Sequence, residues 1–286
     1  MQNGKKTALI CGMAKSGIAS VILLYKNGYK IIINDMKSEI SGLQEALKDI
    51  EYVNAMGQEP ETLLDGVDLL VLSPVIPIFK PFARKAQDMG IEVIGEIELG
   101  YRYCHRGAKF VCISGTNGKT TVANMLNDVL TAEGKTVLSN RAGSNIISGV
   151  STALLKGCGL LGRVRPEYDL AILEIDERSA PRIYPYVKPE HIVITNLFRD
   201  SIMRNAHPGY IADILTRSLP KESRLILNAD DPLVSLFGRG RPNKVVWFGM
   251  DRQRFSTDRS TGIYDDGKYC PLCHAPMAYD YYHYNQ

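Results

Sequence analysis

A glycine-bearing segment that ends in Lys-Thr is the part of the sequence whose residue types most clearly indicate chemistry. The segment reads Gly115, Thr116, Asn117, Gly118, Lys119, Thr120 and Thr121, between an apolar run and an amphipathic helical pattern. Glycines let backbone N–H groups approach phosphate oxygens, and a helix N-terminus adds partial positive charge. Lys119 can neutralise phosphate charge and the Thr120 hydroxyl can bind Mg²⁺. The segment therefore predicts a site for ATP and Mg²⁺, although only two residues separate the glycines.

Carboxylates and amides follow three later apolar runs. Glu174, Asp176 and Glu177 come at the end of one run, Asn196 follows the next, and the turn-like segment 228–232 follows a third. Ligands of parallel α/β sheets bind beyond the carboxyl ends of the strands. We therefore expect these side chains at the same edge as the glycine segment.

The elements that must position these residues are short, continuous apolar runs rich in Ile, Val and Leu. The strand candidates are 8–11, 30–34, 68–72, 91–94, 110–113, 136–138, 170–175, 191–195, 224–227 and 245–248. Runs without polar alternation are typical of strands buried on both faces of a parallel sheet. Helical patterns lie between them, which predicts an α/β fold. We expect two units, residues 1–106 and residues 107–286.

The first unit begins with its own strand, glycine loop and helix pattern. Gly12, Ser16 and Gly17 follow the first apolar run, and Asp35 ends the second run. This arrangement is similar to a Rossmann nucleotide site in which the acid accepts a hydrogen bond from the ligand. Because the glycine pattern is incomplete, it is weak by itself. An NAD-dependent oxidoreductase is therefore one alternative function.

The overall composition excludes several function classes. Hydrophobic residues make up 45% of the 286 residues, charged residues make up 23%, and the formal net charge is +3. That charge gives no support for a nucleic-acid partner. No apolar stretch reaches the roughly 18 residues that span a membrane, and the N-terminus lacks the pattern of a signal peptide. We expect a cytoplasmic protein.

The segment Gly115–Thr121 resembles the ATP-binding signature of the Mur ligase family. The resemblance implies a Rossmann-like, UDP-binding-type N-terminal domain followed by a phosphate-loop central domain. It also implies an ATP-dependent carboxylate–amine ligase of peptidoglycan precursor synthesis. In such enzymes ATP phosphorylates a carboxylate, and an amine then displaces the acyl phosphate. Catalysis depends mainly on positioning and on charge neutralisation.

The resemblance also assigns roles to individual residues. It implies that Lys119 and Glu174 are catalytic, that Thr120 and Glu174 hold Mg²⁺, and that Asn228 and Asp231 contact the nucleoside. The residues that it implies for the substrate or its UDP group are Ser16, Asp35, Ser73, Asn140, Asn145 and Asn196. Asp200 matches a position near the metal and substrate. Val75 departs from the glycine that the family usually carries there, which predicts crowding of the ligand loop.

Two branches of the family resemble different parts of the chain. The N-terminal unit is similar to MurD, which adds D-glutamate to UDP-N-acetylmuramoyl-L-alanine. The central unit is similar to MurT, which amidates D-glutamate in lipid II together with the glutaminase GatD. MurD would carry Ser-Ser-Phe-Gln after Glu174 and a lysine near 210–219, and this chain has neither. The resemblance therefore favours MurT-like amidation of a muramoyl peptide, with MurD-type addition to a UDP-linked substrate as the alternative.

A cysteine pair marks the end of the sequence. Cys270 and Cys273 form a C-x-x-C, a pattern typical of half a zinc site, with two reduced thiols as the alternative. MurT-like proteins carry a four-cysteine zinc ribbon at this point, so residues 268–286 are interpreted as a partial ribbon that binds Zn²⁺. The family's C-terminal domain is expected to be absent from the 286 residues. A truncated hybrid or a nucleotide-binding remnant without catalysis is the remaining hypothesis.

Overall fold

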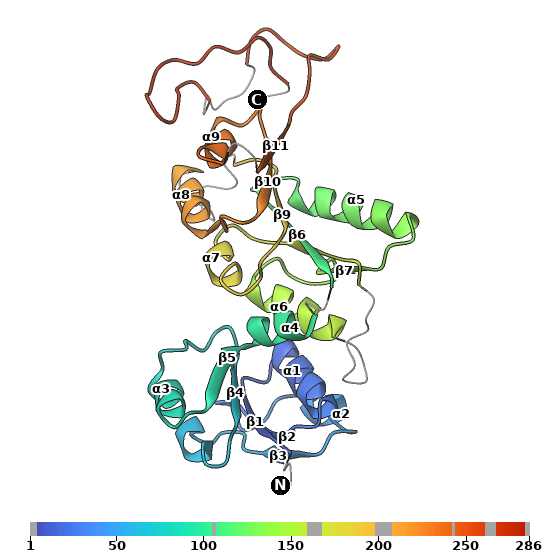
Figure 1. Cartoon of the computed structure of the whole chain (residues 1–286), viewed down its shortest axis with the longest axis vertical. Helices are drawn as coiled ribbons and strands as arrows, with labels where there is room; N and C mark the ends of the chain where they lie inside the picture. The colour runs from blue at the N-terminus through green and yellow to red at the C-terminus, as the bar shows by residue number, and fades with distance from the viewer. Residues whose placement is uncertain are drawn as a thin grey trace.

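The computed structural model describes residues 5–104, 107–158, 168–197, 208–241, 244–260 and 267–283. Its described part contains two parallel sheets stacked along the long axis of the molecule, with helices packed on them (Figure 1). All ten strand candidates of the sequence form strands, so the predicted α/β class is confirmed. Residues 105 and 106, where the first unit was predicted to end, and Asp200 lie outside the described residues.

The first sheet has the strand order β3-β2-β1-β4-β5, with every pair parallel. Its strands are β1 (Thr7–Cys11), β2 (Lys30–Asn34), β3 (Tyr52–Asn54), β4 (Leu69–Leu72) and β5 (Glu92–Gly95). The connecting helices are α1 (Lys15–Lys26), α2 (Leu43–Ala46), the 3-10 turn η1 (Pro60–Leu63) and α3 (Pro81–Asp88). This order is that of a Rossmann half, whose ligands bind where the strand order reverses, beside β1.

The second sheet has the order β11-β10-β9-β6-β8-β7, again with every pair parallel. Its strands are β6 (Lys109–Ser114), β7 (Val137–Ser139), β8 (Leu170–Glu174), β9 (His191–Ile194), β10 (Arg224–Asn228) and β11 (Val245–Phe248). Its helices are α5 (Lys119–Ala132), α6 (Ile147–Gly157), α7 (Ala180–Ile183), α8 (Pro208–Ser218) and α9 (Pro232–Ser235), with the 3-10 turn η2 (Leu236–Gly238). Strand order reverses between β6 and β9, so the loop after β6 lies at the switch point.

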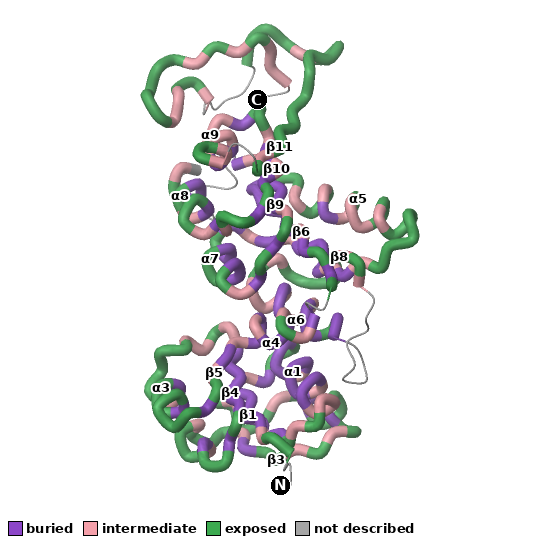
Figure 2. Tube along the Cα trace, viewed as in Figure 1, coloured by how far each residue is buried: buried purple, intermediate pink, exposed green. Residues whose placement is uncertain are grey.

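Helix α4 (Glu96–Cys104) connects the two units and packs against α6, while α1 also contacts α6 (Figure 1). A Cβ on Gly100 would lie 2.8 Å from the Leu154 Cβ, so the glycine lets the two helices approach. Leu23, Leu99 and Leu154 are all at most 2% exposed and belong to one hydrophobic core that continues across the junction. Figure 2 shows this band of buried residues along α1 and α6. Removing this apolar surface from water holds the two sheets together.

Candidate active site

The phosphate loop joins the buried strand β6 to the N-terminus of α5. Gly115 has a φ of +128°, and a Cβ there would lie 2.2 Å from the Thr195 Oγ1. Gly118 caps α5 in the left-handed region with a φ of +76°. Residues with a Cβ are disfavoured in this region, so both glycines are required by the backbone itself. The structure thus places the predicted loop at the carboxyl edge of the sheet, with the N-terminal N–H groups of α5 beside it.

The tip of the loop is fixed by the end of β9. The Asn196 Oδ1 accepts hydrogen bonds from the Thr116 Oγ1 and from the Asn117 N–H, both at 3.0 Å. The Asn196 Nδ2 donates to the Asn117 carbonyl at 3.1 Å, and the Thr195 Oγ1 donates to the same carbonyl at 2.6 Å. Asn196 was predicted to contact substrate. In this structure its side chain instead orders the loop, and a substrate contact stays a prediction.

Lys119 folds back into the loop that it follows. Its Nζ donates to the Gly115 carbonyl at 3.0 Å and lies 3.6 Å from the Glu177 Oε1. The Lys119 side chain is 13% exposed and the Glu177 side chain is 3% exposed. The ammonium group therefore lies inside the glycine loop, where it can meet a phosphate oxygen. Glu177 was recognised in the sequence only as one of three adjacent carboxylates, and its contact with the loop is a new observation.

Oxygen ligands suited to Mg²⁺ meet beside the loop. The Thr120 Oγ1 donates to the Glu174 Oε1 at 2.9 Å, and the Asn145 Nδ2 donates to the same oxygen at 2.8 Å. Asn140 fixes the strand end, since its Nδ2 donates to the Glu174 carbonyl at 2.8 Å and its Oδ1 accepts the Glu174 N–H at 2.9 Å. A hydroxyl and a carboxylate at a phosphate loop fit Mg²⁺, which prefers hard oxygen ligands. The predicted metal pair therefore lies together in the structure.

The predicted nucleoside contacts follow β10, two strands away from β6. The Asn228 Nδ2 donates to the Thr195 carbonyl at 2.9 Å, so its amide braces the neighbouring strand end. Asp231 is 2% exposed and accepts three backbone N–H groups, those of Leu197 at 2.6 Å, Leu233 at 2.8 Å and Val234 at 3.1 Å. Burial raises the pKa of Asp231, and these hydrogen bonds lower it in part.

Asp231 thus acts in this structure as the N-cap of the short helix α9, and it also orders the residue after Asn196. That structural role was not predicted from the sequence. It leaves the carboxylate little surface for a ligand, while a nucleoside contact for Asp231 stays a prediction.

The residues predicted for the first unit gather beside its glycine loop. The Asp35 Oδ2 accepts the Met13 N–H at 2.8 Å, so the acid orders the loop after β1. A Cβ on Gly12 would lie 2.5 Å from the Ser73 Cβ, which places the two loops in contact. Ser16 is 3% exposed at the start of α1. Val75 is 82% exposed, so its side chain lies in solvent and the crowding predicted for this position is not seen.

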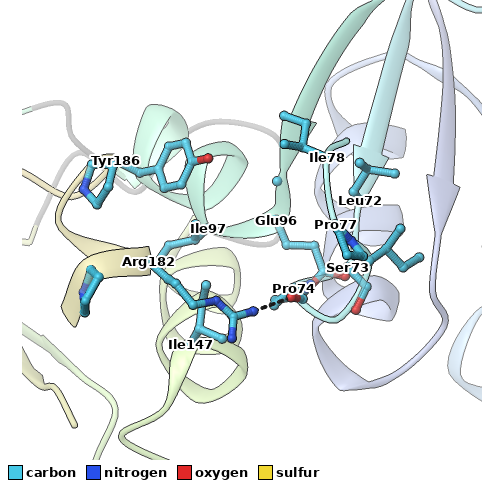
Figure 3. Close-up of a pocket in the computed structure, with 14 residues that line it drawn as sticks. Leu72, Ser73, Pro74, Pro77, Ile78, Glu96, Ile97, Ile147, Arg182 and Tyr186 are labelled. Carbon is cyan, nitrogen blue, oxygen red and sulfur yellow. Dashed lines mark hydrogen bonds between the residues drawn. The ribbon is translucent and has the colours of Figure 1, made fainter. Parts of the chain in front are cut away.

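A cavity of about 290 Å³ lies at the junction of the two units (Figure 3). One wall is the loop after β4, with Ser73 and Pro74, and the opposite wall is α7 with Arg182. The Arg182 Nη2 donates to the Pro74 carbonyl at 2.6 Å and bridges the two walls. Glu96 also lines the cavity, is 0% exposed, and has no hydrogen-bond partner for either carboxylate oxygen. Burial raises its pKa to about 7, and the nearby Ser16 side chain lowers it only in part.

Sequence reasoning missed Glu96 and Arg182 as features of the site. Their only signal was an acid at the start of a helix pattern and an arginine in a short segment that forms α7, both common on protein surfaces. The contact between Arg182 and Pro74 joins residues that are 108 positions apart in the sequence. It exists only because the two units pack against each other.

The cysteine pair lies in a hairpin away from both glycine loops. The Cys270 N–H donates to the Ala275 carbonyl and the His274 N–H donates to the Cys270 carbonyl, at 2.8 and 2.9 Å. Hydrogen bonds from the backbone N–H groups of Cys273 and Leu272 and from the Cys273 thiol lower the pKa of Cys270. Within the described residues no group of three or more His, Cys, Asp or Glu side chains could hold a metal ion. The predicted Zn²⁺ site is therefore not supported by the described part of the chain.

Among the described residues, no helix is both long and apolar enough to cross a membrane.

Comparisons with known proteins agree with this geometry. The family model of the Mur ligase MurD-like N-terminal domain matches residues 6–95, and that of the Mur ligase middle domain matches residues 113–270. The MurT subunit of lipid II isoglutaminyl synthase (glutamine-hydrolyzing) from Staphylococcus aureus (strain COL) is 34% identical over 177 residues. The UDP-N-acetylmuramoylalanine–D-glutamate ligase of Alkaliphilus metalliredigens (strain QYMF) is 42% identical over 142 residues.

The chain matches only part of these relatives. The alignments cover 62% of this chain and 38% of the MurT subunit, and 47% of this chain and 30% of the D-glutamate ligase. A pseudomurein peptide ligase type C from Methanothermus fervidus shares the fold, with a TM-score of 0.57 at 22% identity. That alignment covers 96% of this chain and 54% of the other. The family model of the Mur ligase middle domain by itself matches more than half of the residues of this chain, and the chain therefore belongs to the Mur ligase family.

Proposed function

We propose that this chain binds ATP and Mg²⁺ at the phosphate loop and serves as the ATP-using part of a carboxylate–amine ligase that acts on a muramoyl peptide. The observation that carries the proposal is the meeting of Lys119, Thr120 and Glu174 at one loop, with Thr120 and Glu174 2.9 Å apart. These are the charge and the oxygen ligands that phosphoryl transfer requires.

Each residue has a separable task in this proposal. The N-terminal N–H groups of α5 face phosphate oxygens, and Lys119 neutralises charge on the transferring group. Thr120 and Glu174 would hold Mg²⁺, which supplies charge neutralisation when it is bound. Asn145 and Asn140 hold the Glu174 side chain and backbone in place. Activation of a carboxylate as an acyl phosphate supplies the good leaving group that amide formation needs.

For the substrate, we propose MurT-like amidation of D-glutamate in lipid II, with a glutaminase subunit such as GatD as partner. Two features support this choice over the alternative. The Ile-Asp-Glu that follows Glu174 replaces Ser-Ser-Phe-Gln, and 210–219 contains no lysine. The 34% identity to a MurT subunit over 177 residues agrees with it.

A MurD-type addition of D-glutamate to UDP-N-acetylmuramoyl-L-alanine is the second candidate. The MurD-like N-terminal match over residues 6–95 favours it, as does the placement of Ser16, Asp35 and Ser73 around one glycine loop. In that case the cavity at the domain junction lies beside the UDP-binding loop, where a muramoyl group can extend toward the phosphate loop.

The test is release of inorganic phosphate from ATP by the full chain. The chain is supplied in parallel with lipid II, glutamine and GatD, and with UDP-N-acetylmuramoyl-L-alanine and D-glutamate. Release that depends on the first set supports MurT-like amidation, and release that depends on the second supports MurD-type addition. ATP binding without turnover in either set would reject the ligase proposal and leave a nucleotide-binding remnant. No ATP binding at all would reject the site itself.

A further inference from the structure

Glu177 lies inside the phosphate loop rather than at its rim. It follows β8 by three residues, yet its side chain is only 3% exposed. Its Oε1 accepts the Gly115 N–H at 2.8 Å and lies 3.6 Å from the Lys119 Nζ. The Ser114 Oγ is 3.5 Å from the same oxygen, but that hydroxyl has a better acceptor in the Ile175 carbonyl at 2.9 Å.

These partners belong to the same loop that a phosphate group would contact. A backbone N–H of a glycine loop and the ammonium of the loop lysine are the donors that such loops offer to anions. A carboxylate oxygen in this place presents a negative charge and an acceptor, as a phosphate oxygen does. The described residues show no second carboxylate paired with Lys119, since Glu174 is bonded instead to Thr120 and Asn145.

We propose that Glu177 is a positioning residue that acts as an internal anion: it holds Gly115 and Lys119 in place and competes with the nucleotide's phosphates for Lys119. This inference rests on the proposed function, because it assumes that ATP binds at this loop. It explains how a buried lysine keeps a partner before the nucleotide arrives, since an unpaired buried charge is costly. It also predicts that the fixed negative charge weakens nucleotide affinity.

The energetic sign follows from charge. Bound ATP brings several negative charges to a loop that already holds the Glu177 carboxylate, and at partly buried sites such repulsion is only partly screened. Replacing Glu177 with glutamine keeps an oxygen that can accept the Gly115 N–H but removes the charge. The gain in affinity of this variant over the wild type should therefore be larger for ligands that carry more phosphates. If the role of Glu177 were purely structural, the substitution would change the affinity for all ligands by the same factor.

The test measures dissociation constants of ATP, ADP and adenosine for the full chain in the presence of Mg²⁺ by calorimetry. For Glu177→Gln we expect ATP to bind about threefold to tenfold more tightly, ADP to gain less, and adenosine to change by less than about twofold. Glu177→Asp keeps the charge and should bind ATP no more tightly than the wild type. Glu190→Gln is the matched control, because Glu190 is exposed at the opposite, amino-terminal edge of the same sheet.

The outcomes separate this inference from the proposed function. Weaker or unchanged ATP binding by Glu177→Gln, beside normal binding by the wild type, overturns the internal-anion role alone. An equal change for all three ligands also overturns it and assigns Glu177 a purely structural role. Absence of ATP binding by the wild type and by every variant overturns both this inference and the nucleotide site. Thermal unfolding of each variant shows whether a loss of ATP binding reflects loss of the fold. If Glu177→Gln does not fold, Glu177→Ser takes its place: tighter ATP binding supports the internal-anion role, and weaker or unchanged binding overturns it.

Discussion

The two units of this chain carry the same local pattern, a buried strand followed by a glycine loop and a helix, and use it in different ways. In the first unit seven of the twelve residues of α1 are buried, and the helix packs across the domain junction on α6. In the second unit α5 has fourteen residues, and only Ala123 is buried (Figure 2). Helix α1 is therefore part of the core that crosses the junction, whereas α5 packs on its own sheet through Ala123 and the half-buried Val122, Leu126 and Leu130.

The glycines show the same difference. A Cβ on Gly17 would lie 1.9 Å from the Gly12 carbonyl oxygen, so this glycine is required by packing. No atom lies within 4 Å of a Cβ on Gly118, so that glycine is required only by its φ of +76°. The glycine at the start of α1 is therefore enclosed by its neighbours, whereas the glycine that caps α5 faces open space. A strand–glycine–helix pattern alone therefore does not show which loop binds a phosphate.

The largest expected effect tests the lysines of the two loops. Lys119→Ala should weaken ATP binding by at least about a hundredfold, because it removes a charge-assisted contact to phosphate. Lys15→Ala, the matched change at the exposed start of α1, should leave ATP affinity within about twofold. Calorimetric titration of both variants with ATP and Mg²⁺ measures the contrast. Equal losses, or no loss for Lys119→Ala, would mean that the nucleotide site is placed at the wrong loop.

The glycines sharpen the comparison through stability. Gly17→Ala should lower the free energy of unfolding by about 3 kcal/mol or more, because the added methyl group would collide with a backbone oxygen. Gly118→Ala should cost only about 1–2 kcal/mol, the usual penalty for a left-handed residue in open space. Urea unfolding of both variants measures the two values. If Gly118→Ala were the more destabilising change, the distinction between a glycine required by packing and one required only by its φ would be wrong.

In the first unit, the free energy of unfolding should depend on pH through Glu96. Its carboxylate is buried beside Gly17 of the first glycine loop and lacks a hydrogen-bond partner. Its folded pKa of about 7 lies above the value of about 4.5 that is usual for an exposed glutamate. The native state therefore binds more protons than the unfolded state between these values, and stability falls as pH rises through this window. The loss should reach at most about 3 kcal/mol above pH 7.

Glu96→Gln imitates the protonated acid and should abolish most of this dependence, so that the variant is more stable than the wild type at pH 8. Urea unfolding between pH 4.5 and pH 8 measures the slope. Glu45→Gln is the control, because the Glu45 side chain is 78% exposed and should leave the slope unchanged. An identical slope for wild type and Glu96→Gln would contradict the burial of an unpartnered carboxylate.

Sequence patterns predicted the fold well where an element is determined locally. All ten predicted strands are present because each is a continuous apolar run that must be buried on both faces. Strand β3 was missed, since Tyr52–Asn54 is short, lies at the sheet edge and has two exposed residues. The placement of Gly115, Lys119, Thr120 and Glu174 at one edge also follows from parallel topology alone.

The parts of the site that could not be predicted depend on contacts between distant segments. Asp231 was predicted as a nucleoside contact from its motif, but its carboxylate caps α9 and binds the Leu197 N–H, 34 residues away. Asn196 orders the loop across 80 residues of sequence, and Glu177 does so across 62. The residue types show that these polar groups need hydrogen-bond partners. Which partners they have depends on the order of the strands in the folded sheet, because that order brings the carboxyl ends of distant strands together.

The smallest expected effect concerns the metal pair of the second loop, which has no counterpart in the first. Thr120→Val removes the hydroxyl that lies 2.9 Å from the Glu174 Oε1 and keeps the shape of the side chain. We expect Mg²⁺ to strengthen ATP binding about threefold to tenfold less in this variant, because one hard oxygen ligand is lost. Thr121→Val is the matched control one residue along α5, with no predicted metal contact. Calorimetric titration with ATP, with and without Mg²⁺, measures the difference. Equal Mg²⁺ dependence in both variants would mean that the metal is held by Glu174 and the phosphates without Thr120, which would confine the role of Thr120 to orienting the Glu174 carboxylate.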